Sequence, residues 1–256
     1  MHQTKKKFGQ NFIKDKNLIH KIINASDLDN KQVIEIGPGM GALTKQIAQR
    51  AKDFFAFEID KDLKPYLELI PNVHVIYDDI LKINITHLQN NYNLTDVTLI
   101  SNLPYYITTP ILFLFLEHPI FTKGIFMVQK EVALRLMARP STKEYNALSV
   151  ICQYLTKVEK VIDVNKKMFN PVPKVDSIVV KLIKLNNGKN LNFELVKACF
   201  AYKRKTLINN LLQKYPIDKN ILIKILIDNN IPSDIRAEAL SIEQFIKLSA
   251  LFKDLI

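Results

Sequence analysis

Short β-branched or aromatic runs alternate with helical patterns through the first half of the chain, and this alternation limits the folds open to it. The extended runs cover residues 33–36, 54–57, 73–77, 97–100 and 124–128. Helical patterns occur at residues 43–51, 63–70, 110–117 and 131–137. Alternating strands and helices favour a parallel, doubly wound sheet, because each helix carries the chain back across the sheet.

Two later runs extend this sheet. Residues 158–164 and 178–185 are strand-like and close enough in sequence to form a hairpin at the sheet edge. The sequence therefore predicts an α/β fold with seven strands, mostly parallel and with an antiparallel edge. From Asn186 a polar linker leads into helix periodicity without a further strand run. We expect a sheet domain over residues 1–185 and a small all-α domain over residues 186–256.

Charge and composition restrict the partners and the compartment. Thirty-six basic against 25 acidic residues give the 256-residue chain a formal net charge of +11, which favours polyanionic partners. Cys152 and Cys199 have no CxxC spacing and the histidines form no ligand-spaced group, so no metal is implied. No apolar run follows the charged start, and the most apolar run, 111–116, is too short to span a bilayer. We expect a cytoplasmic protein without a membrane segment.

A glycine-rich turn follows the first strand of the alternating pattern. Gly37, Gly39 and Gly41 are spaced GxGxG at the end of this strand, where glycine lets the backbone approach a ligand closely. The dinucleotide spacing is GxGxxG instead, and Glu35 just before the turn would repel a pyrophosphate. The turn therefore indicates a cofactor without phosphates, although a turn of this kind can also be purely structural.

Acidic residues at the next two strand ends favour the cofactor interpretation. Glu58 follows the second strand, where a carboxylate can accept hydrogen bonds from both hydroxyls of an adenosyl ribose. Asp79 follows the third strand and is placed to accept from an adenine amino group, with Ile80 as an apolar cover. An adenosyl cofactor fits these positions.

The fourth strand ends in Asn102-Leu103-Pro104-Tyr105. The exocyclic amine of adenine is a poor nucleophile because its lone pair is delocalised into the ring. The Asn102 side-chain oxygen and the Leu103 carbonyl, in a turn restrained by Pro104, could accept both amine hydrogens and draw the nitrogen towards tetrahedral geometry. Tyr105 would stack on the flipped base. The same residues could form an ordinary turn, but the position directly after a strand favours chemistry.

These motifs, with others along the chain, resemble the ribosomal RNA adenine N6,N6-dimethyltransferase family. Within that family the bacterial small-subunit enzymes are more similar than the erythromycin-resistance methylases. The motifs that carry the resemblance are residues 7–12, the glycine turn, 102–105, 169–177 and 236–238. Two departures are small, because Tyr106 stands where asparagine is common and Ile80 where alanine is frequent.

The resemblance implies a Rossmann-like class I methyltransferase fold and S-adenosyl-L-methionine as cofactor. By this resemblance Asn11 and Ile13 would line the cofactor, beside Gly37, Gly39, Gly41, Glu58, Asp79, Ile80 and Asn102. Phe169 would be the second aromatic face on the target base, opposite Tyr105. The expected reaction is dimethylation of two adjacent adenines in a hairpin loop near the 3′ end of 16S rRNA within the immature 30S subunit.

Two basic clusters are candidate RNA contacts. Lys5, Lys6 and Lys7 form an N-terminal arm, and Lys203, Arg204 and Lys205 open the helical C-terminal segment. A charge run is more often a solvated face, but the second cluster matches a basic segment of the family. We expect recognition of an assembled RNA by shape, and a monomeric protein.

Two other functions stay open at this point. The first is a related methylase that acts on large-subunit rRNA and confers drug resistance. The second is a catalytically idle RNA-binding assembly factor with the same fold. The intact Glu58, Asp79 and Asn102 argue against loss of chemistry, but not against an additional role in subunit assembly.

Overall fold

The protein is described by a computed structural model that covers residues 10–186 and 190–253. It divides into two compact units, one of residues 1–133 with 157–184 and the other of 134–156 with 185–256. Residues 134–156 thus cluster with the C-terminal segment, although they precede the boundary expected at residue 185. The division into functional domains at 185/186 stays a prediction.

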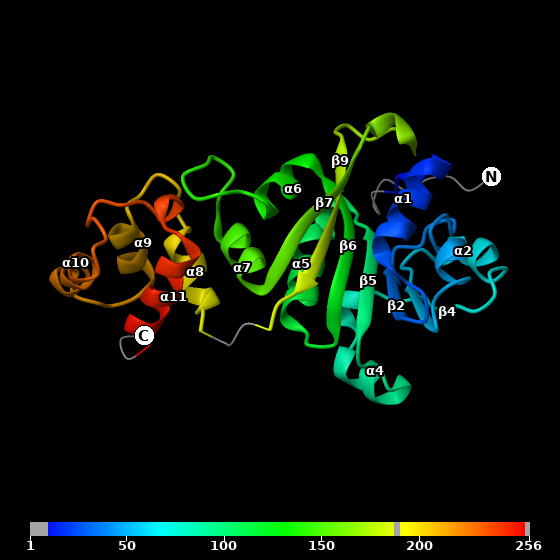
Figure 1. Ribbon diagram of the computed structural model, residues 1–256, viewed down its shortest axis with the longest axis horizontal. Helices are drawn as coiled ribbons and strands as arrows, with labels where there is room; N and C mark the ends of the chain where they lie inside the picture. Colours follow the sequence, from blue (N-terminus) through cyan, green and yellow to red (C-terminus); the bar gives the residue numbers. More distant parts are fainter. Residues whose placement is uncertain (1–9, 187–189, 254–256) are drawn as a thin grey trace. The chain divides into compact units, whose positions relative to one another are not determined.

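The first unit is built on a seven-stranded sheet (Figure 1). Its strands are β2 (Gln32–Ile36), β3 (Asp53–Phe57), β4 (His74–Ile76), β5 (Val97–Asn102), β6 (Phe121–Gln129), β7 (Thr156–Val164) and β9 (Ser177–Lys184). The order is β4-β3-β2-β5-β6-β9-β7, with parallel pairs from β4 to β6 and β9 antiparallel to β6. The predicted mixed sheet is confirmed.

The register brings the carboxyl ends of the central strands together. Ile36 lies opposite Phe57 on β3 and Ser101 on β5, so the loops after these three strands leave the sheet at one level. The chain order reverses at β2, which has β3 on one side and β5 on the other. In open α/β sheets this switch point is where ligands bind.

Helices flank the sheet within the first unit. They are α1 (Lys16–Ser26), α2 (Thr44–Ile47), α3 (Lys64–Leu67), α4 (Ile85–Tyr92) and α5 (Thr108–Glu117), with 3-10 turns at Lys61–Leu63, Ile80–Lys82, Tyr105–Ile107 and Lys166–Met168. Helix α6 (Lys130–Leu136) begins in the first unit and ends in the second. The helices expected at 43–51 and 63–70 are each reduced to a single turn. A short strand pair, β1 (Phe12–Ile13) with β8 (Phe169–Asn170), lies apart from the main sheet.

The sheet has apolar residues on both faces because strand side chains alternate. On β6, Ile125 and Met127 are buried in one cluster with Leu18 and Ile22 of α1. The intervening Phe126 meets Phe115 of α5 edge-on, at 5.3 Å between ring centroids. Strand β6 is therefore buried on both faces, as expected for a strand in the middle of a doubly wound sheet.

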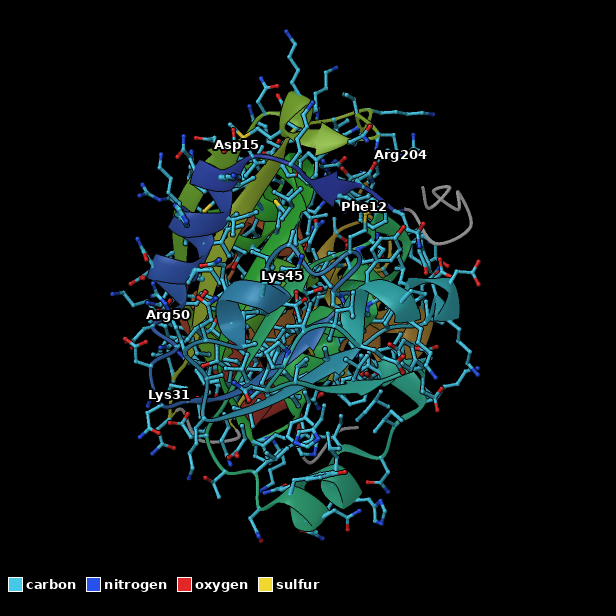
Figure 2. All side chains as sticks on the ribbon, turned by 90° about the vertical axis from the view of Figure 1, so that its right-hand side faces the viewer. Phe12, Asp15, Lys31, Lys45, Arg50 and Arg204 are labelled. Atoms are coloured by element: carbon cyan, nitrogen blue, oxygen red, sulfur yellow. The ribbon has the colours of Figure 1, made fainter. Side chains whose placement is uncertain are left out.

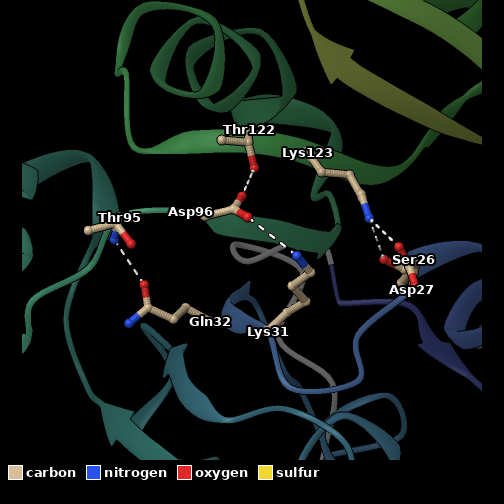
Figure 3. A network of polar contacts seen from close by, with 8 residues as sticks. All are labelled: Ser26, Asp27, Lys31, Gln32, Thr95, Asp96, Thr122 and Lys123. Carbon is tan, nitrogen blue, oxygen red and sulfur yellow. Dashed lines mark hydrogen bonds and ion pairs between the residues drawn. The ribbon is translucent and has the colours of Figure 1, made fainter.

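Polar contacts fix the opposite, amino-terminal edge of the sheet (Figure 3). Asp96 accepts a hydrogen bond from Thr122 and forms an ion pair with Lys31 at 3.4 Å. The Gln32 side chain accepts from the backbone of Thr95 at 2.9 Å. These contacts join the starts of β2, β5 and β6 at the amino-terminal edge of the sheet. The loops that follow β2, β3 and β5 leave the sheet at the other, carboxyl edge.

The second unit is helical over the residues described. Its helices are α7 (Ala147–Leu155), α8 (Phe193–Cys199), α9 (Leu207–Lys214), α10 (Lys219–Asp228) and α11 (Ile242–Leu251), with a 3-10 turn at Ala237–Ala239. A polar side chain caps the start of each helix: Asn146, Asn192, Thr206, Asp218 and Ser241. Such caps satisfy amide groups that a helix leaves unpaired, and they explain why the helices begin there. Cys152 and Cys199 are buried and free.

Candidate active site

A cavity of about 220 Å³ opens at the carboxyl ends of β2, β3, β4 and β5. Each loop after these strands contributes to its lining, together with the N-terminal segment and Phe169. The sequence-predicted residues that line it are Asn11, Ile13, Gly37, Gly39, Glu58, Asp79, Ile80, Asn102, Leu103, Pro104, Tyr105 and Phe169. Segments distant in sequence therefore meet at one site.

The glycine turn after β2 adopts a backbone that side chains disfavour. Gly37, Gly39 and Gly41 have φ values of 71°, 60° and 82°, all in the left-handed region. A Cβ on Gly37 would have no atom within 4 Å, so the space beside this glycine is open. A Cβ on Gly41 would lie 2.5 Å from Ile70 Cδ1, and Gly41 is not among the residues that line the cavity. In this structure Gly41 permits close packing, whereas Gly37 and Gly39 border the cavity.

Glu58 is held at the cavity wall by backbone donors. Its two carboxylate oxygens accept hydrogen bonds from Gly39 N at 3.1 Å and Asp60 N at 2.8 Å. The side chain is buried, and burial raises the pKa of its carboxyl while the two backbone hydrogen bonds oppose that rise. Each carboxylate oxygen can accept a second hydrogen bond, which leaves room for a ligand hydroxyl.

Glu35 is a buried acid at the same cavity, and the sequence assigned it only a repulsive role. Its side chain is 2% exposed, and its Oε2 atom has no hydrogen-bond partner in the described part of the chain. Burial raises the pKa of Glu35 to about 8, the charge of Glu58 adds to this rise, and the neighbouring Thr44 hydroxyl opposes it. A buried carboxyl group beside the cavity disfavours a ligand that carries negative charge there.

The charge of the cavity agrees with that preference. Four lining residues are acidic, Glu35, Glu58, Asp78 and Asp79, and none of the described lining residues is basic. A pyrophosphate would be repelled here, whereas a sulfonium or ammonium group would be attracted. The lining residues thus fit S-adenosylmethionine better than a phosphate-bearing cofactor.

The adenine end of such a ligand would meet the loop after β4. The Asp79 side chain accepts from Leu81 N at 3.0 Å, which fixes its carboxylate at the start of a 3-10 turn. Ile80 is buried beside it and lines the cavity. These two positions keep the expected pairing of an acceptor with an apolar cover.

Asn102 ends β5 with its side-chain amide in a fixed orientation. Its Nδ2 donates to the Asn11 carbonyl at 3.0 Å, so the amide oxygen is directed away from that carbonyl. Leu103 N donates to Met127 O at 3.1 Å, and the Leu103 carbonyl accepts no hydrogen bond from residues that the structure describes. Pro104 is extended, with φ −58° and ψ 134°. Two acceptors, one from the side chain and one from the backbone, are thereby left for a ligand.

Aromatic rings border the same cavity. Tyr105 is partly exposed, and burial raises the pKa of its hydroxyl, so the phenol is neutral. Phe169 lines the cavity but is only 2% exposed. It lies on β8, where its backbone is paired with Ile13 of β1. The clamp of Tyr105 and Phe169 stays a prediction, in which a base would approach the exposed part of the cavity.

These features agree with what similar proteins show. The sequence model of the family described as ribosomal RNA adenine dimethylase matches residues 1–254. The chain belongs to this family. A relative from Onion yellows phytoplasma (strain OY-M), named ribosomal RNA small subunit methyltransferase A, is 48% identical over 97% of this chain and 96% of its own. A relative of the same name from Bacillus cereus (strain B4264) is 45% identical, over 96% and 90% respectively.

Two solved structures share the fold over nearly the whole chain. A dimethyladenosine transferase from Plasmodium falciparum is similar with a TM-score of 0.81 and 28% identity, covering 95% of this chain and 98% of that protein. The 23S rRNA methyltransferase ErmE is similar with a TM-score of 0.66 and 27% identity, covering 94% and 98%. The predicted family, class I methyltransferase fold and enzyme class are confirmed.

Several contributors to the site lie in or beside the sequence motifs but had no predicted role. Phe12 lies on β1 (Figure 2), and a Cβ on Gly39 would come within 2.9 Å of its ring. Gln10 donates to Asp60 at 2.7 Å, and Tyr106 lines the cavity while 56% exposed. The pairing of β1 with β8 brings the N-terminal motif to the 169–177 motif, and such pairing between distant segments leaves no local pattern.

Of the two predicted RNA-binding clusters, one lies within the residues that the structure describes. Lys203, Arg204 and Lys205 belong to the second unit, in the loop before α9. Lys5, Lys6 and Lys7 lie outside the residues that the structure describes. Over residues 10–186 and 190–253, no cluster of His, Cys, Asp or Glu is arranged to hold a metal ion, and no helix is long and apolar enough to cross a membrane.

Proposed function

We propose that this protein uses S-adenosylmethionine to dimethylate the N6 atoms of two adjacent adenines in a hairpin loop near the 3′ end of 16S rRNA. The substrate is the immature 30S subunit in the cytoplasm, and the protein acts as a monomer. The small-subunit name of the relatives at 45–48% identity supports this target over a large-subunit one.

The observation that carries the proposal is the pair of acceptors at the rim of an acidic cavity. The Asn102 amide is anchored through its nitrogen, which leaves its oxygen for an incoming amine. The Leu103 carbonyl is the second acceptor, and the backbone nitrogen of Leu103 is itself fixed to β6. Two acceptors placed in this way could accept hydrogen bonds from both amine hydrogens of adenine at the same time.

The chain contributes positioning and charge stabilisation to the reaction. S-adenosylmethionine, when bound, supplies a methyl group activated by a positively charged sulfur. Asn102 and Leu103 hold the amine nitrogen so that its lone pair faces that methyl group, and they stabilise the positive charge that develops on nitrogen. No general base is needed before the new carbon–nitrogen bond forms. The methyl–sulfur bond would break in the same step, S-adenosylhomocysteine would leave, and the methylated amine would then release one proton to water.

Two transfers to one nitrogen are compatible with this arrangement. After the first transfer the amine keeps one hydrogen, so one of the two acceptors is enough to orient it. Tyr105 and Phe169 would hold the base by its faces, which are unchanged by methylation on nitrogen. The residues at 186–256, with Lys203, Arg204 and Lys205, would bind RNA phosphates together with the arm of Lys5, Lys6 and Lys7.

The test is transfer of labelled methyl groups to three substrates: unmethylated small subunits, large subunits and protein-free rRNA. Reverse transcription then locates dimethylated adenines, because they block the polymerase. We expect label only on small subunits, at two adjacent adenines near the 3′ end of 16S rRNA.

Two results would contradict the proposal. Label on large subunits would assign the protein to methylases that act like ErmE, the 23S rRNA enzyme that shares its fold. Cofactor binding without any label would favour a binding-only assembly factor. In that case the Asn102→Ala variant should still bind subunits and support assembly.

A further inference from the structure

Tyr106 lines the cofactor cavity, but the proposed reaction gives it no role. It follows Tyr105 directly, on the 3-10 turn Tyr105–Ile107 after β5. Its side chain is 56% exposed, so much of the ring surface is still open to a ligand. The position is also one of the two small departures from the family motifs. An exposed aromatic ring that lines a cavity is well suited to cover what binds there.

The two neighbouring tyrosines approach different parts of the sheet. Burial raises the pKa of the Tyr105 hydroxyl and the Ser177 hydroxyl opposes this rise, so Tyr105 lies near the start of β9. Partial burial also raises the pKa of the Tyr106 hydroxyl, and the charges of Asp79 and Glu58 raise it further. Tyr106 therefore lies towards the ends of β4 and β3. In the sheet, these two strands and β9 are on opposite sides of β5.

The end of the cavity near Tyr106 combines hydrogen-bond acceptors with apolar surface. The acceptors are the carboxylates of Glu58 and Asp79. The residue that follows each of them, Ile59 and Ile80, also lines the cavity. Tyr106 adds an aromatic ring to this apolar surface. Such a lining suits a nucleoside, because hydroxyls and an amine can donate to the carboxylates while the flat faces of the base meet apolar side chains.

A base of the bound RNA is the other group on which a ring at this position could stack. The charges beside Tyr106 argue against it. Each RNA base is linked to phosphates, and the Asp79 and Glu58 carboxylates would repel a phosphate in their neighbourhood. The adenosyl group of S-adenosylmethionine has the same kind of base but no phosphate. The observations therefore favour the cofactor over the RNA as the group that Tyr106 contacts.

We propose that Tyr106 is a cofactor-binding residue, whose ring covers the adenosyl group of S-adenosylmethionine beside Asp79 and Ile80. This inference rests on the proposed use of that cofactor and does not depend on which RNA is methylated. Consecutive residues of one turn would then serve two different adenines. Tyr105 would stack on the target base, and Tyr106 would stack on the adenine of the cofactor.

The first test measures the Kd of S-adenosylhomocysteine by calorimetry, without RNA. Tyr106→Ala should raise this Kd about 5- to 150-fold, the usual range for loss of one aromatic ring stacked on a base. Tyr202→Ala is the matched control, because Tyr202 is 51% exposed, belongs to the second unit and does not line the cavity. It should bind as the parent does. Equal Kd values for Tyr106→Ala and the parent would overturn the proposal.

Tyr106→Phe separates the ring from the hydroxyl. The ring is retained, so we expect the Kd of S-adenosylhomocysteine to rise by no more than about 5-fold, as for loss of one hydrogen bond. The larger effect should appear only when the ring itself is removed. A loss in Tyr106→Phe as great as that in Tyr106→Ala would assign the contact to the hydroxyl and overturn the ring as a cover.

A fluorescent probe can report the stacking directly, because the chain contains no tryptophan. Tyr106→Trp places a single indole at this position, and Tyr202→Trp places one at the control position. Saturation with S-adenosylhomocysteine should quench the emission of Tyr106→Trp and leave that of Tyr202→Trp unchanged. Emission that responds to small subunits but not to S-adenosylhomocysteine would assign Tyr106 to an RNA base instead.

The binding measurements distinguish this inference from the proposed function. A parent protein that binds no S-adenosylhomocysteine would refute both. Binding by the parent, with the same Kd for Tyr106→Ala, would refute the role of Tyr106 alone. A selective loss of affinity in Tyr106→Ala would support that role even if the labelled methyl groups were found on large subunits.

Discussion

The side-chain nitrogen of Asn102 donates a hydrogen bond to the backbone carbonyl of Asn11 at 3.0 Å, across 91 residues of sequence. An amide whose nitrogen is anchored in this way presents its oxygen in one direction only. Asn11 therefore orients the Asn102 side chain and also borders the cavity. Deleting the N-terminal segment that contains Asn11 should lower kcat, because the Asn102 amide would lose its anchor.

Asn102→Ala removes one of the two proposed acceptors for the adenine amine. We expect kcat for methyl transfer to fall about 10²- to 10³-fold, the usual effect of deleting one oriented dipole at a reacting centre. The affinity for S-adenosylmethionine, measured by calorimetry, should change far less. Asn91→Ala on the exposed face of α4 is the control and should retain full activity. Parallel losses of affinity and turnover would show that Asn102 mainly binds cofactor.

Phe169 needs a conservative substitution because it is 2% exposed and part of the core. Replacing such a phenylalanine by alanine costs about 3–5 kcal/mol of stability, so Phe169→Leu is the better probe. We expect kcat/KM for RNA to fall while the Kd for cofactor is unchanged, since the ring would contact the target base. Phe115→Leu changes a buried ring that does not line the cavity, and it should lower Tm without the same loss of activity. Equal loss of cofactor affinity in Phe169→Leu would refute the clamp.

Glu35 makes stability depend on pH. Its pKa is raised from 4.5 to about 8, so the folded state binds a proton that the unfolded state releases between these values. The free energy of unfolding should therefore fall as pH rises through this window, by at most about 1.4 kcal/mol per pH unit, and level off above pH 8. Urea titrations of Glu35→Gln should lack this component.

A cationic cofactor should act on the same group. The positive charge of S-adenosylmethionine next to Glu35 would stabilise the carboxylate and lower its pKa. Cofactor binding at pH 7 should then release protons, detectable as buffer-dependent heats in calorimetry. Proton release that persists unchanged in Glu35→Gln would place the titrating group elsewhere.

The basic cluster before α9 should determine the salt dependence of RNA binding. Replacing Lys203, Arg204 and Lys205 together by Glu should flatten the plot of log K against log salt, because phosphate contacts release counterions. A triple replacement of the exposed Lys219, Lys224 and Lys253 by Glu changes net charge equally and is the control. If both triple variants show the same slope, the contact surface lies elsewhere.

The sequence by itself determined the sheet and the positions of the cofactor residues. The short β-branched or aromatic runs and the glycine turn are local features, and the loop after each parallel strand must emerge at the same edge. Gly37, Glu58, Asp79 and Asn102 could therefore be placed together from their positions at strand ends, and all four line one cavity. The order of β9 and β7 at the edge was less defined, because both strands carry similar patterns.

The tertiary structure decided how those residues are oriented and which others join them. The pairing of β1 with β8, the direction of the Asn102 amide and the isolation of Glu35 Oε2 depend on contacts between distant segments. Periodicity and propensity report only on near neighbours in the chain, whereas burial and hydrogen bonding are set by whatever the fold brings alongside.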